Sequence, residues 1–512
     1  MRKGTSFAKP LAVAFCAPAL FALLFSCASA PADGGRARAS AAVLPDPAET
    51  LRAATRFYGA QRSGTLDNWL LAQYPPELRA PCFTRDGESL REGLDLSGGW
   101  HDAGDFIKFT LTTAYSAHAL LKSWDAFPAA HADLYGPDGS SGPDGIPDVL
   151  NEAKWGLDWL LKIHLDSAAL VSQIGDHTDH ETPGTCPARA DMSPVSGGEP
   201  RPVWFGDTRD DPSRVKADLL GMTAAALALA GRLYSPYDSV YARACVAHAR
   251  QLYATAVDRP GTTPSPNGET FYVKRGWEDD LLCGAVELFR ATGERNYLSD
   301  ALEADRRLGD HGWVVDWGQH ADFCRHSLAV SDSLGRLAGE GNWGRAVARY
   351  RTKVSDAPEV AGLAFFGEWG SLRYAMNAAF SSALYASVYG DSAAASFAER
   401  QWDWALGDNP YGHSFVVGVG TNPPKAPHHK NAFGERRWAS PSDTSRYPLV
   451  GALVGGPHLQ TYSDPWMTSP PGWRDAMNDY VGNEVSIDYN AGLVGTSAFV
   501  ALRRGKAAKA GE

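Results

Sequence analysis

Helical periodicity is the feature that most constrains the fold of this chain. Apolar residues recur at spacings of three and four in many separate segments, while alternation with the period of a strand is rare. The clearest segment, ADLLGMTAAALALAG, predicts a helix over about 216–233. Because it is apolar on nearly every side, this helix is expected to be buried on several faces. The same period predicts further helices near residues 114–124, 150–160, 242–252, 282–289, 371–388 and 393–405.

Long loops separate the predicted helices. They are rich in Gly, Pro, Asp and aromatic residues and cover about 75–100, 133–147, 172–214, 258–278 and 407–480. Loops of this length in a compact domain usually carry function. We therefore expect an all-α scaffold with its site residues on loops. The 512 residues can bury a large core, and we expect one catalytic domain over 48–505 with a C-terminal tail at 506–512.

The N-terminal residues are expected to direct export. Basic residues precede an apolar run that is too short for a convincing membrane span, which is the layout of a secretory signal over residues 1–27. Two processing sites compete: ASA, which Pro31 follows directly, and LFSC, which resembles the box that ends in a lipid-modified cysteine, here Cys27. Residues 28–47 have the composition of a linker. We expect a secreted, periplasmic or outer-surface protein, with a lipid anchor at Cys27 as one of the two outcomes.

Charge and cysteine content argue against other classes of protein. The net charge is -11 and no basic stripe is present, which argues against binding of nucleic acid. Two of the seven cysteines lie in the signal, and the other five are scattered without a CxxC pair. This spacing predicts neither a disulfide framework nor a zinc finger, and we assign no disulfide from it.

Two aspartates in SGGWHDAGDFIKF are the first candidates for chemistry. Asp102 and Asp105 are three residues apart among apolar neighbours, so a turn at residues 103–104 would project them together. Three interpretations stay open. Asp102 is the N-cap of a helix that begins near Phe106, the pair binds calcium, or the pair orients and deprotonates a water molecule.

A second acidic stretch, WRDAMNDYVGNEVSIDYNAGLVG, covers residues 473–495. Glu484 lies next to Val485 and near aromatic residues, where desolvation would raise its pKa and keep it protonated near neutral pH. The alternative is a glutamate at a helix start that pairs with a cation, but no lysine or arginine lies between Asp475 and Asn490.

A third stretch, residues 407–430, contains two adjacent histidines. His428 and His429 are expected to point apart, which makes them poor joint metal ligands. A surface position and a contact with a sugar hydroxyl both stay open for a histidine here. Two acids far apart in sequence, many aromatic residues and an exported chain are together typical of a glycosidase. In such an enzyme one carboxyl group protonates the leaving oxygen, and the other activates water or attacks carbon.

These stretches resemble the signature regions of glycoside hydrolase family 9, the inverting cellulases. The resemblance runs from about Phe57 to Gly495 through ordered blocks: FYGAQRSG, SGGWHDAGDFIKF, QIGD, RATGERNYL, EWGSLRYAMNAAF, ALGDNP, VVGVGTNPP, PHH and GNEVSIDYNAGLVG. It implies an (α/α)6 barrel whose loops form a substrate cleft. It also implies hydrolysis of β-1,4-glucosidic bonds in cellulose or related β-glucans with inversion, with no cofactor required for the chemistry.

The resemblance implies roles for individual residues. Asp105 would be the general base, Asp102 would hold the attacking water, and Glu484 would be the general acid. Asp475 belongs to the same catalytic signature. The implied substrate contacts are His428, Trp369, Arg373, Tyr374 and Lys430, the last in place of the arginine that is usual in the family.

The resemblance also implies a structural calcium ion at the segment KRGWEDDLL. The expected ligands are the side chains of Asp279, Asp280 and Asp316 with the carbonyl groups of Arg275 and Gly276. Oxygen ligands in a loop suit this ion. The alternative is that these acids only decorate a helix N-terminus, where they complement the helix dipole.

Two further interpretations of the function stay open. The segments 182–202 and 435–472 differ from those of simple family members, and such loops can close one end of a cleft. This favours, as one alternative, an exo-acting enzyme on short gluco- or glucosamine oligosaccharides. A catalytically inactive glycan-binding protein is the other, although it would need neither Asp105 nor Glu484. In each case we expect a monomer that binds a polysaccharide or an oligosaccharide.

Overall fold

The computed structural model describes residues 43–64, 82–136, 141–181, 200–433, 444–464 and 467–510. The expected signal with Cys27, most of the linker, and residues 182–199, 435–443 and 465–466 of the two segments that differ from simple family members lie outside these ranges. Residues 42–512 form one compact unit. No described helix combines the length and the hydropathy that a membrane span requires.

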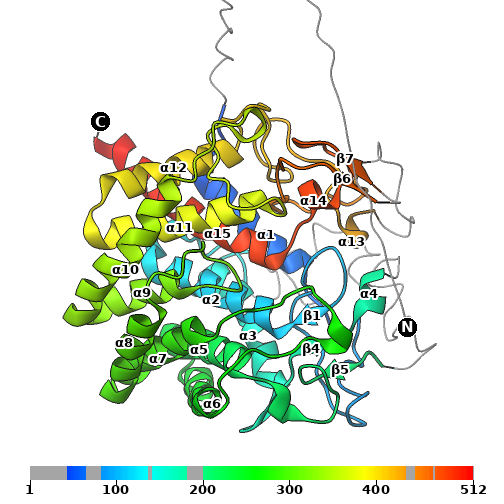
Figure 1. Ribbon diagram of the computed structural model, residues 1–512, viewed down its shortest axis with the longest axis vertical. Helices are drawn as coiled ribbons and strands as arrows, with labels where there is room; N and C mark the ends of the chain where they lie inside the picture. The colour runs from blue at the N-terminus through cyan, green and yellow to red at the C-terminus, as the bar shows by residue number, and fades with distance from the viewer. Residues whose placement is uncertain are drawn as a thin grey trace, which may run out of the picture. The chain divides into compact units, whose positions relative to one another are not determined.

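Six helices form a closed inner ring within this unit (Figure 1). Each packs against the next in chain order, and the last packs against the first. These helices are α2 (Thr110–Ala126), α5 (Ala217–Tyr234), α7 (Glu278–Thr292), α9 (Ala321–Ser331), α11 (Ser371–Tyr389) and α15 (Ile487–Ala510). In α5 every residue except Arg232 is buried, which confirms the expectation from its apolar sequence. Helix α15 continues into the segment that was expected to be a tail.

Six more helices pack around the outside of the ring. They are α1 (Pro47–Ala60), α3 (Asp148–Ile163), α6 (Ser239–Asp258), α8 (Arg295–Leu308), α10 (Ser333–Arg351) and α12 (Ser392–Ala405). Each contacts one main inner helix: α3 packs on α2, α6 on α5, α8 on α7, α10 on α9, α12 on α11, and α1 on α15. Two concentric rings of six helices are an (α/α)6 barrel, so the expected fold class is confirmed.

Local sequence signals set the ends of several helices. Asp46 caps α1 by accepting hydrogen bonds from the backbone N–H groups of Ala48 and Glu49, and Pro47 takes the first helical position. At the other end, α7 and α11 stop at Gly293 and Gly390, whose φ angles of 76° and 72° are costly for other residues.

Short strands and helices support the loops at one end of the barrel. A three-stranded antiparallel sheet joins β1 (Lys108–Phe109), β4 (Gln173–Ile174) and β5 (Val203–Trp204), with Lys108 paired to Ile174 and Gln173 to Trp204. Two hairpins pair β2 (His164–Asp166) with β3 (Ala169–Leu170) and β6 (Tyr462–Ser463) with β7 (Thr468–Ser469). The short helices are α4 (His177–Glu181), α13 (Lys430–Phe433) and α14 (Tyr480–Asn483).

The start of α2 decides one of the open interpretations. This helix begins at Thr110 with Phe109 as its N-cap residue, and β1 lies just before it. Asp102 is therefore not a helix N-cap. The carboxylate pair lies in the loop ahead of β1, and the sheet fixes the chain that leaves this loop.

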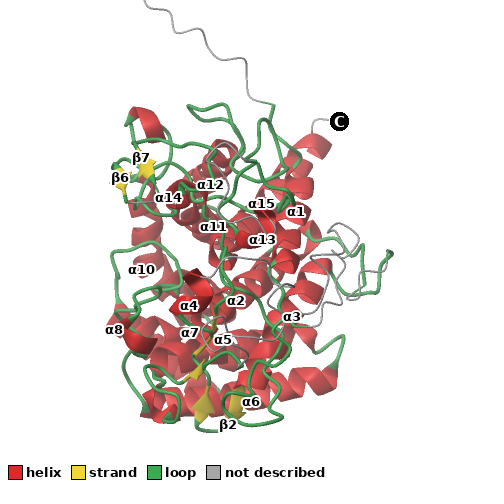
Figure 2. Cartoon of the chain, turned by 90° about the vertical axis from the view of Figure 1, so that its right-hand side faces the viewer, coloured by secondary structure: helices red, strands yellow, loops and turns green. Residues whose placement is uncertain are grey.

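Segments that precede the inner helices meet at one end of the barrel. The DAGD loop before α2 is bonded to the start of α15, and Tyr272 before α7 is bonded to Asp102. Trp369 before α11 is bonded to Glu484 before α15. The short elements α4, α13 and α14 lie on this side, at the right of Figure 1 and toward the viewer in Figure 2. Helix N-termini carry partial positive charge, which favours carboxylates near them.

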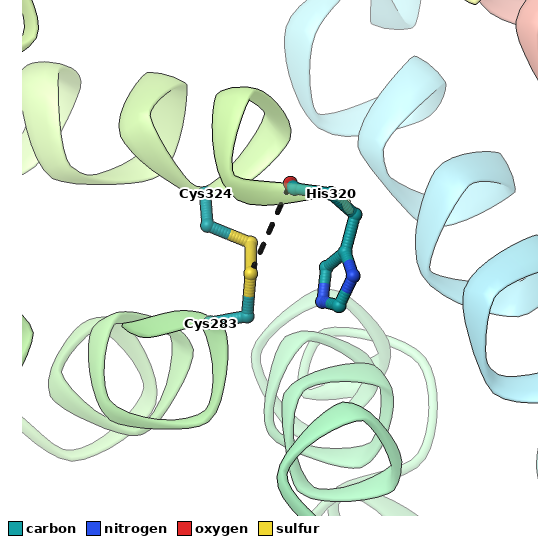
Figure 3. A group of neighbouring side chains, drawn as sticks. All are labelled: Cys283, His320 and Cys324. Atoms are coloured by element: carbon teal, nitrogen blue, oxygen red, sulfur yellow. Dashed lines mark hydrogen bonds between the residues drawn. A yellow bond between two sulfur atoms is a disulfide. The ribbon is translucent and has the colours of Figure 1, made fainter. Parts of the chain in front are cut away.

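A disulfide joins two inner helices. Cys283 of α7 is bonded to Cys324 of α9, with 5.1 Å between their Cα atoms, and His320 lies beside the bond (Figure 3). The bond went unassigned from sequence because the two cysteines are 41 residues apart and follow no motif. Packing of α7 against α9 brings them together.

Candidate active site

Three chain segments that carry the expected site residues come together. The N–H of Lys430 bonds the carbonyl of Gly104 at 2.9 Å, and the N–H of His428 bonds the carbonyl of Asn483 at 2.7 Å. The N–H of Ile487 bonds the carbonyl of Asp102 at 2.9 Å. The DAGD loop is therefore held between the histidine segment and the glutamate segment.

Asp105 is a buried carboxylate with fixed hydrogen-bond donors. Its Oδ1 accepts from the N–H of Ile107 at 3.0 Å, and its Oδ2 lies 2.5 Å from Nδ1 of His180 in α4. Burial alone would raise the pKa of Asp105, but His180 and Lys430 lower it below the ordinary 3.8. The ionised form of Asp105 is thus favoured, as a general base requires.

Asp102 is held by two hydroxyl groups. Thr112 donates to its Oδ1 and Tyr272 donates to its Oδ2, each at 2.5 Å. Burial and the charges of Asp488 and Asp105 raise the pKa of Asp102 well above its ordinary value. Asp102 and Asp105 therefore share one loop but differ in the protonation state that their surroundings favour.

Glu484 lies directly after α14 and beside two aromatic donors. The indole N–H of Trp369 donates to its Oε2 at 2.6 Å, and the hydroxyl of Tyr489 donates to the same oxygen at 2.9 Å. Desolvation raises the pKa of Glu484 above the ordinary 4.5 in spite of these donors. The neutral acid is favoured here, which is the state that a general acid needs.

The two adjacent histidines point to different partners, as expected. His428 Nδ1 lies 2.7 Å from the carbonyl of Met477, and a carbonyl only accepts, so Nδ1 carries the proton and Nε2 is an acceptor. Burial lowers the pKa of His428 to about 4, so the ring is neutral at pH 7. His429 instead contacts the side-chain oxygen of Gln61 at 2.7 Å, and Gln61 also bonds the carbonyl of Ala103. His429 thus supports the loop that carries the aspartates.

Lys430 differs from the expectation that it contacts substrate. Its side chain is buried beside Phe106, and its ammonium donates to the carbonyl groups of Asp179 and His180. It therefore positions α4, and with it the histidine that contacts Asp105.

The resemblance places Asp475 in the catalytic signature, but its carboxylate is bonded to backbone N–H groups. It accepts hydrogen bonds from the N–H groups of Lys425 and Ala426, each at 2.8 Å. These residues lead into His428. The structure gives Asp475 the task of fixing the histidine segment against the segment that carries Glu484.

The three expected contacts from WGSLRY lie at the start of α11. Trp369 is 43% exposed although its N–H is bonded to Glu484, so its ring faces solvent at the site. Arg373 is buried, donates to Asp488 at 3.0 Å and to the hydroxyl of Tyr374 at 2.6 Å. Tyr374 packs edge-on against Trp313, which is 41% exposed. Exposed aromatic rings are suited to stacking on sugar rings.

The expected calcium ligands come together only in part. Asp279, Asp280 and His320 have potential ligand atoms within 4.8 Å of one another, and both acids lie in the first turn of α7. Asp316 is outside this group, and its carboxylate accepts from the N–H groups of Trp313 and Gly318. Arg275 and Gly276 lie in the loop just before α7.

A lysine lies where the ion would be. The ammonium of Lys274 is bonded to both Asp279 and Asp280. The residues present therefore do not fit a calcium ion between these two acids. A second possible ligand group, Cys283 with His320 and Cys324, is not a metal site either, because its two sulfur atoms form the disulfide.

Sequence reasoning missed His180, Tyr272 and Tyr489, which contact Asp105, Asp102 and Glu484 respectively. The signal for His180 is its position just after the QIGD block, and that for Tyr272 is the aromatic pair before the acidic segment. Nothing local shows that these residues reach the aspartates, since the contacts span 75 and 170 residues of chain.

The fold and the site define a helical barrel that holds carboxyl groups of opposite protonation preference at one end. The sequence matches the description "Glycosyl hydrolase family 9" over residues 48–497. The chain therefore belongs to glycosyl hydrolase family 9.

Individual relatives agree with this assignment. The chain is 34% identical to Endoglucanase A of Bacillus pumilus over 481 residues, which cover 88% of this chain and 65% of that protein. It is also 34% identical to Endoglucanase 4 of Bacillus sp. (strain KSM-522), over 88% of this chain and 68% of the relative. The chain thus spans about two thirds of the length of both relatives. Among solved structures, the cellulase Cel9M of C. cellulolyticum superposes with a TM-score of 0.72 at 30% identity, over 90% of this chain and 99% of Cel9M.

Proposed function

We propose that this protein is an endo-acting glycoside hydrolase that cleaves β-1,4-glucosidic bonds in cellulose or related β-glucans with inversion of configuration. One observation carries the proposal. Glu484, whose pKa is raised, and Asp105, whose pKa is lowered, lie in loops that are bonded to the same histidine segment. The names of the relatives and a solved complex of Cel9M with cellobiose support the choice of substrate.

Each acid has a distinct task in the proposed reaction. Glu484 donates its proton to the glycosidic oxygen as the bond to the leaving sugar breaks. Asp105 takes a proton from the water that attacks the opposite face of the sugar. Asp102 orients this water, and its hydroxyl donors Thr112 and Tyr272 fix its own direction. An inverting site leaves room for the water, so we expect the carboxyl groups of Asp105 and Glu484 to stand roughly 6.5–9.5 Å apart.

The neighbouring residues hold the sugar in this proposal. Nε2 of His428 accepts a hydrogen bond from a sugar hydroxyl, because its other nitrogen is committed to the carbonyl of Met477. The exposed ring of Trp369 stacks on a sugar ring while its N–H keeps Glu484 oriented. Tyr374 extends this surface from the start of α11, and the buried Arg373 holds the hydroxyl of Tyr374 in place.

The anomer released first from a soluble β-1,4-glucan, followed by proton NMR, tests the mechanism. We expect the α-anomer, because a single displacement by water inverts the anomeric carbon. A β-anomer would mean that a covalent intermediate forms and that the role given to Asp105 is wrong.

Substitutions test the roles of the acids. Asp105→Ala and Glu484→Gln should each lower kcat by at least about 10²-fold with little change in substrate binding. Asp102→Asn should cost less than Asp105→Asn, because the neutral form of Asp102 is already favoured. Glu303→Gln, the same chemical change at an exposed position of α8, should leave kcat unchanged. Equal losses for Asp102→Asn and Asp105→Asn would contradict the division of roles.

We also propose that the chain is exported, with residues 48–505 as the catalytic domain and Cys27 as a lipid-bearing N-terminus. The Cys283–Cys324 disulfide supports export, because such bonds persist mainly in oxidising compartments. Cys27→Ser should move the protein from the membrane fraction to the soluble fraction, since stable anchoring needs the acyl chains. Unchanged partitioning would support plain secretion instead.

A further inference from the structure

A buried lysine links three elements next to the site. Lys274 is 5% exposed, and its ammonium is bonded to Asp279, at 3.2 Å, and to Asp280 at the start of α7. Asp279 also accepts a hydrogen bond from the N–H of His320, the residue before α9, at 3.1 Å. The lysine therefore ties the loop before α7 to the beginnings of α7 and α9.

The charges in this cluster balance without a metal ion. Burial alone would raise the pKa of Asp279, but Lys274 and His320 lower it well below its usual range. Burial and the charge of Asp279 raise the pKa of Asp280. Burial lowers the pKa of His320 to about 4, so its ring is neutral at pH 7. The ammonium of Lys274 thus pairs with the ionised carboxylate of Asp279. A divalent cation placed between the two acids would be repelled by this ammonium.

The loop that Lys274 anchors also carries two aromatic residues of the site. Tyr272, two residues earlier, donates its hydroxyl to Oδ2 of Asp102 at 2.5 Å. The ring of Phe271 lies 5.0 Å from the ring of His180, the histidine that contacts Asp105. A shift of this loop would therefore reach both aspartates through Tyr272 and Phe271.

We propose that Lys274 is a built-in cation that occupies the position of a structural metal ion between Asp279 and Asp280. In this role it is a positioning residue: it fixes the loop before α7 so that Tyr272 stays on Asp102. The kinetic part of this inference rests on the proposed glucanase activity, while the metal part does not.

The first experiment uses the unmodified protein. Its melting temperature is measured in EDTA and in millimolar CaCl2, and titration calorimetry with CaCl2 follows binding at neutral pH. We expect the same melting temperature in both solutions, because the ammonium already neutralises the pair. A shift of several degrees with calcium, traced to this site by its loss in Asp280→Asn, would overturn the inference whatever the enzyme acts on.

The second experiment removes the lysine. Lys274→Ala leaves two buried carboxyl groups and space for an ion, so calcium should now raise the melting temperature and restore part of the lost kcat. Without calcium, kcat should fall by about 10-fold or more, as expected when a catalytic group is displaced by a fraction of an ångström. Lys274→Met fills the space without charge and should lose activity without a calcium response.

A surface lysine provides the matched control. Lys154 pairs with Asp158 at a half-buried position on α3, away from the site, and Lys154→Met should leave both kcat and the calcium response unchanged. Unchanged kcat in Lys274→Ala, or a loss of activity that calcium does not relieve, would overturn the proposal.

A double-mutant cycle separates positioning from general destabilisation. If Lys274 acts through Tyr272, the losses in kcat from Lys274→Met and Tyr272→Phe should not multiply in the double variant, because both remove the same contact to Asp102. Losses that multiply would show that Lys274 stabilises the fold without positioning Tyr272.

Discussion

At the scale of single residues, the surroundings of Asp105 and Glu484 predict a bell-shaped pH dependence of kcat/KM. His180 and Lys430 lower the pKa of Asp105 below 3.8, and desolvation raises the pKa of Glu484 above 4.5. Activity needs Asp105 ionised and Glu484 protonated, so it should fall below the first pKa and above the second. His180→Ala removes a donor to Asp105 and should move the acidic limb toward higher pH. The basic limb should also move upward, because the charge of His180 lowers the pKa of Glu484. An unchanged acidic limb in this variant would contradict the assignment of Asp105 as the base.

The catalytic acids could be predicted from the sequence more fully than the residues that surround them. Two aspartates among apolar neighbours and a glutamate without a nearby cation already indicated chemistry at Asp102, Asp105 and Glu484. Their protonation preferences depend on His180 and on burial, which tertiary packing creates. Tertiary packing also explains why the role of Lys430 could not be predicted. The sequence places Lys430 in the histidine segment, but it does not show that the ammonium contacts the carbonyl groups of α4.

At the scale of elements, the close approach of two loops depends on Gly104. A Cβ atom at this position would lie 2.4 Å from the carbonyl oxygen of His428 and 2.9 Å from the Cα of His429, both of them backbone atoms. Gly104→Ala should therefore push the aspartate loop away from the histidine segment. We expect kcat/KM to fall by about 10²-fold or more, because small displacements at a reacting centre are costly. Gly98→Ala is less suitable as a control because of its positive φ of 95°. Gly341→Ala, on α10, adds a methyl group whose near neighbour is the side chain of Arg345 at an ordinary contact distance of 3.8 Å, and it should leave kcat/KM unchanged.

The disulfide between α7 and α9 should matter for stability more than for chemistry. The bridge joins residues that are 41 positions apart in the chain. Its loss frees the unfolded chain from this constraint and should lower the free energy of unfolding by about 4 kcal/mol. The double variant Cys283→Ser/Cys324→Ser should melt at a lower temperature, measured by calorimetry, while kcat at 25 °C stays close to that of the unmodified protein. Cys245→Ser changes a buried free cysteine and provides the comparison for loss of a thiol alone. A melting temperature equal to that of Cys245→Ser would contradict the stabilising role.

At the scale of the whole molecule, the sequence predicted the helices but not how they close. The segment that became α5 is apolar all round, and this is the property of an inner helix. In α8 the buried residues Leu298, Ala301 and Asp305 lie along one face, as in an outer helix. The contact of α15 with α2 joins segments more than 350 residues apart, and no local pattern carries that information. Periodicity alone does not predict the number of helix pairs, and the expectation of six pairs comes from the resemblance to family 9.

Buried charges that join several helices should make the barrel sensitive to acid. Asp322 of α9 accepts hydrogen bonds from Tyr350 of α10 and Ser381 of α11, and its other oxygen contacts Arg325 and His311. Burial alone would raise the pKa of Asp322, but His311 and Arg325 lower it to about 2. Because this value lies below the roughly 3.9 of the unfolded chain, the ionised carboxylate contributes about 2.6 kcal/mol to the free energy of unfolding, which is fully present only above about pH 5. The contribution is lost as the pH falls through about 2.

The variant Asp322→Asn tests this dependence. It should lower the free energy of unfolding by at least about 2 kcal/mol at pH 7, since it also leaves Arg325 without one of its carboxylate partners. The difference from the unmodified protein should shrink as denaturant melts are repeated from pH 5 toward pH 2, because protonation then removes from the unmodified protein the charge that the variant already lacks. Asp207→Asn breaks the exposed pair with Arg214 and should cost less than about 1 kcal/mol at any pH. A cost for Asp322→Asn that stays constant down to pH 2 would mean that its hydrogen bonds, rather than its charge, hold α9, α10 and α11 together.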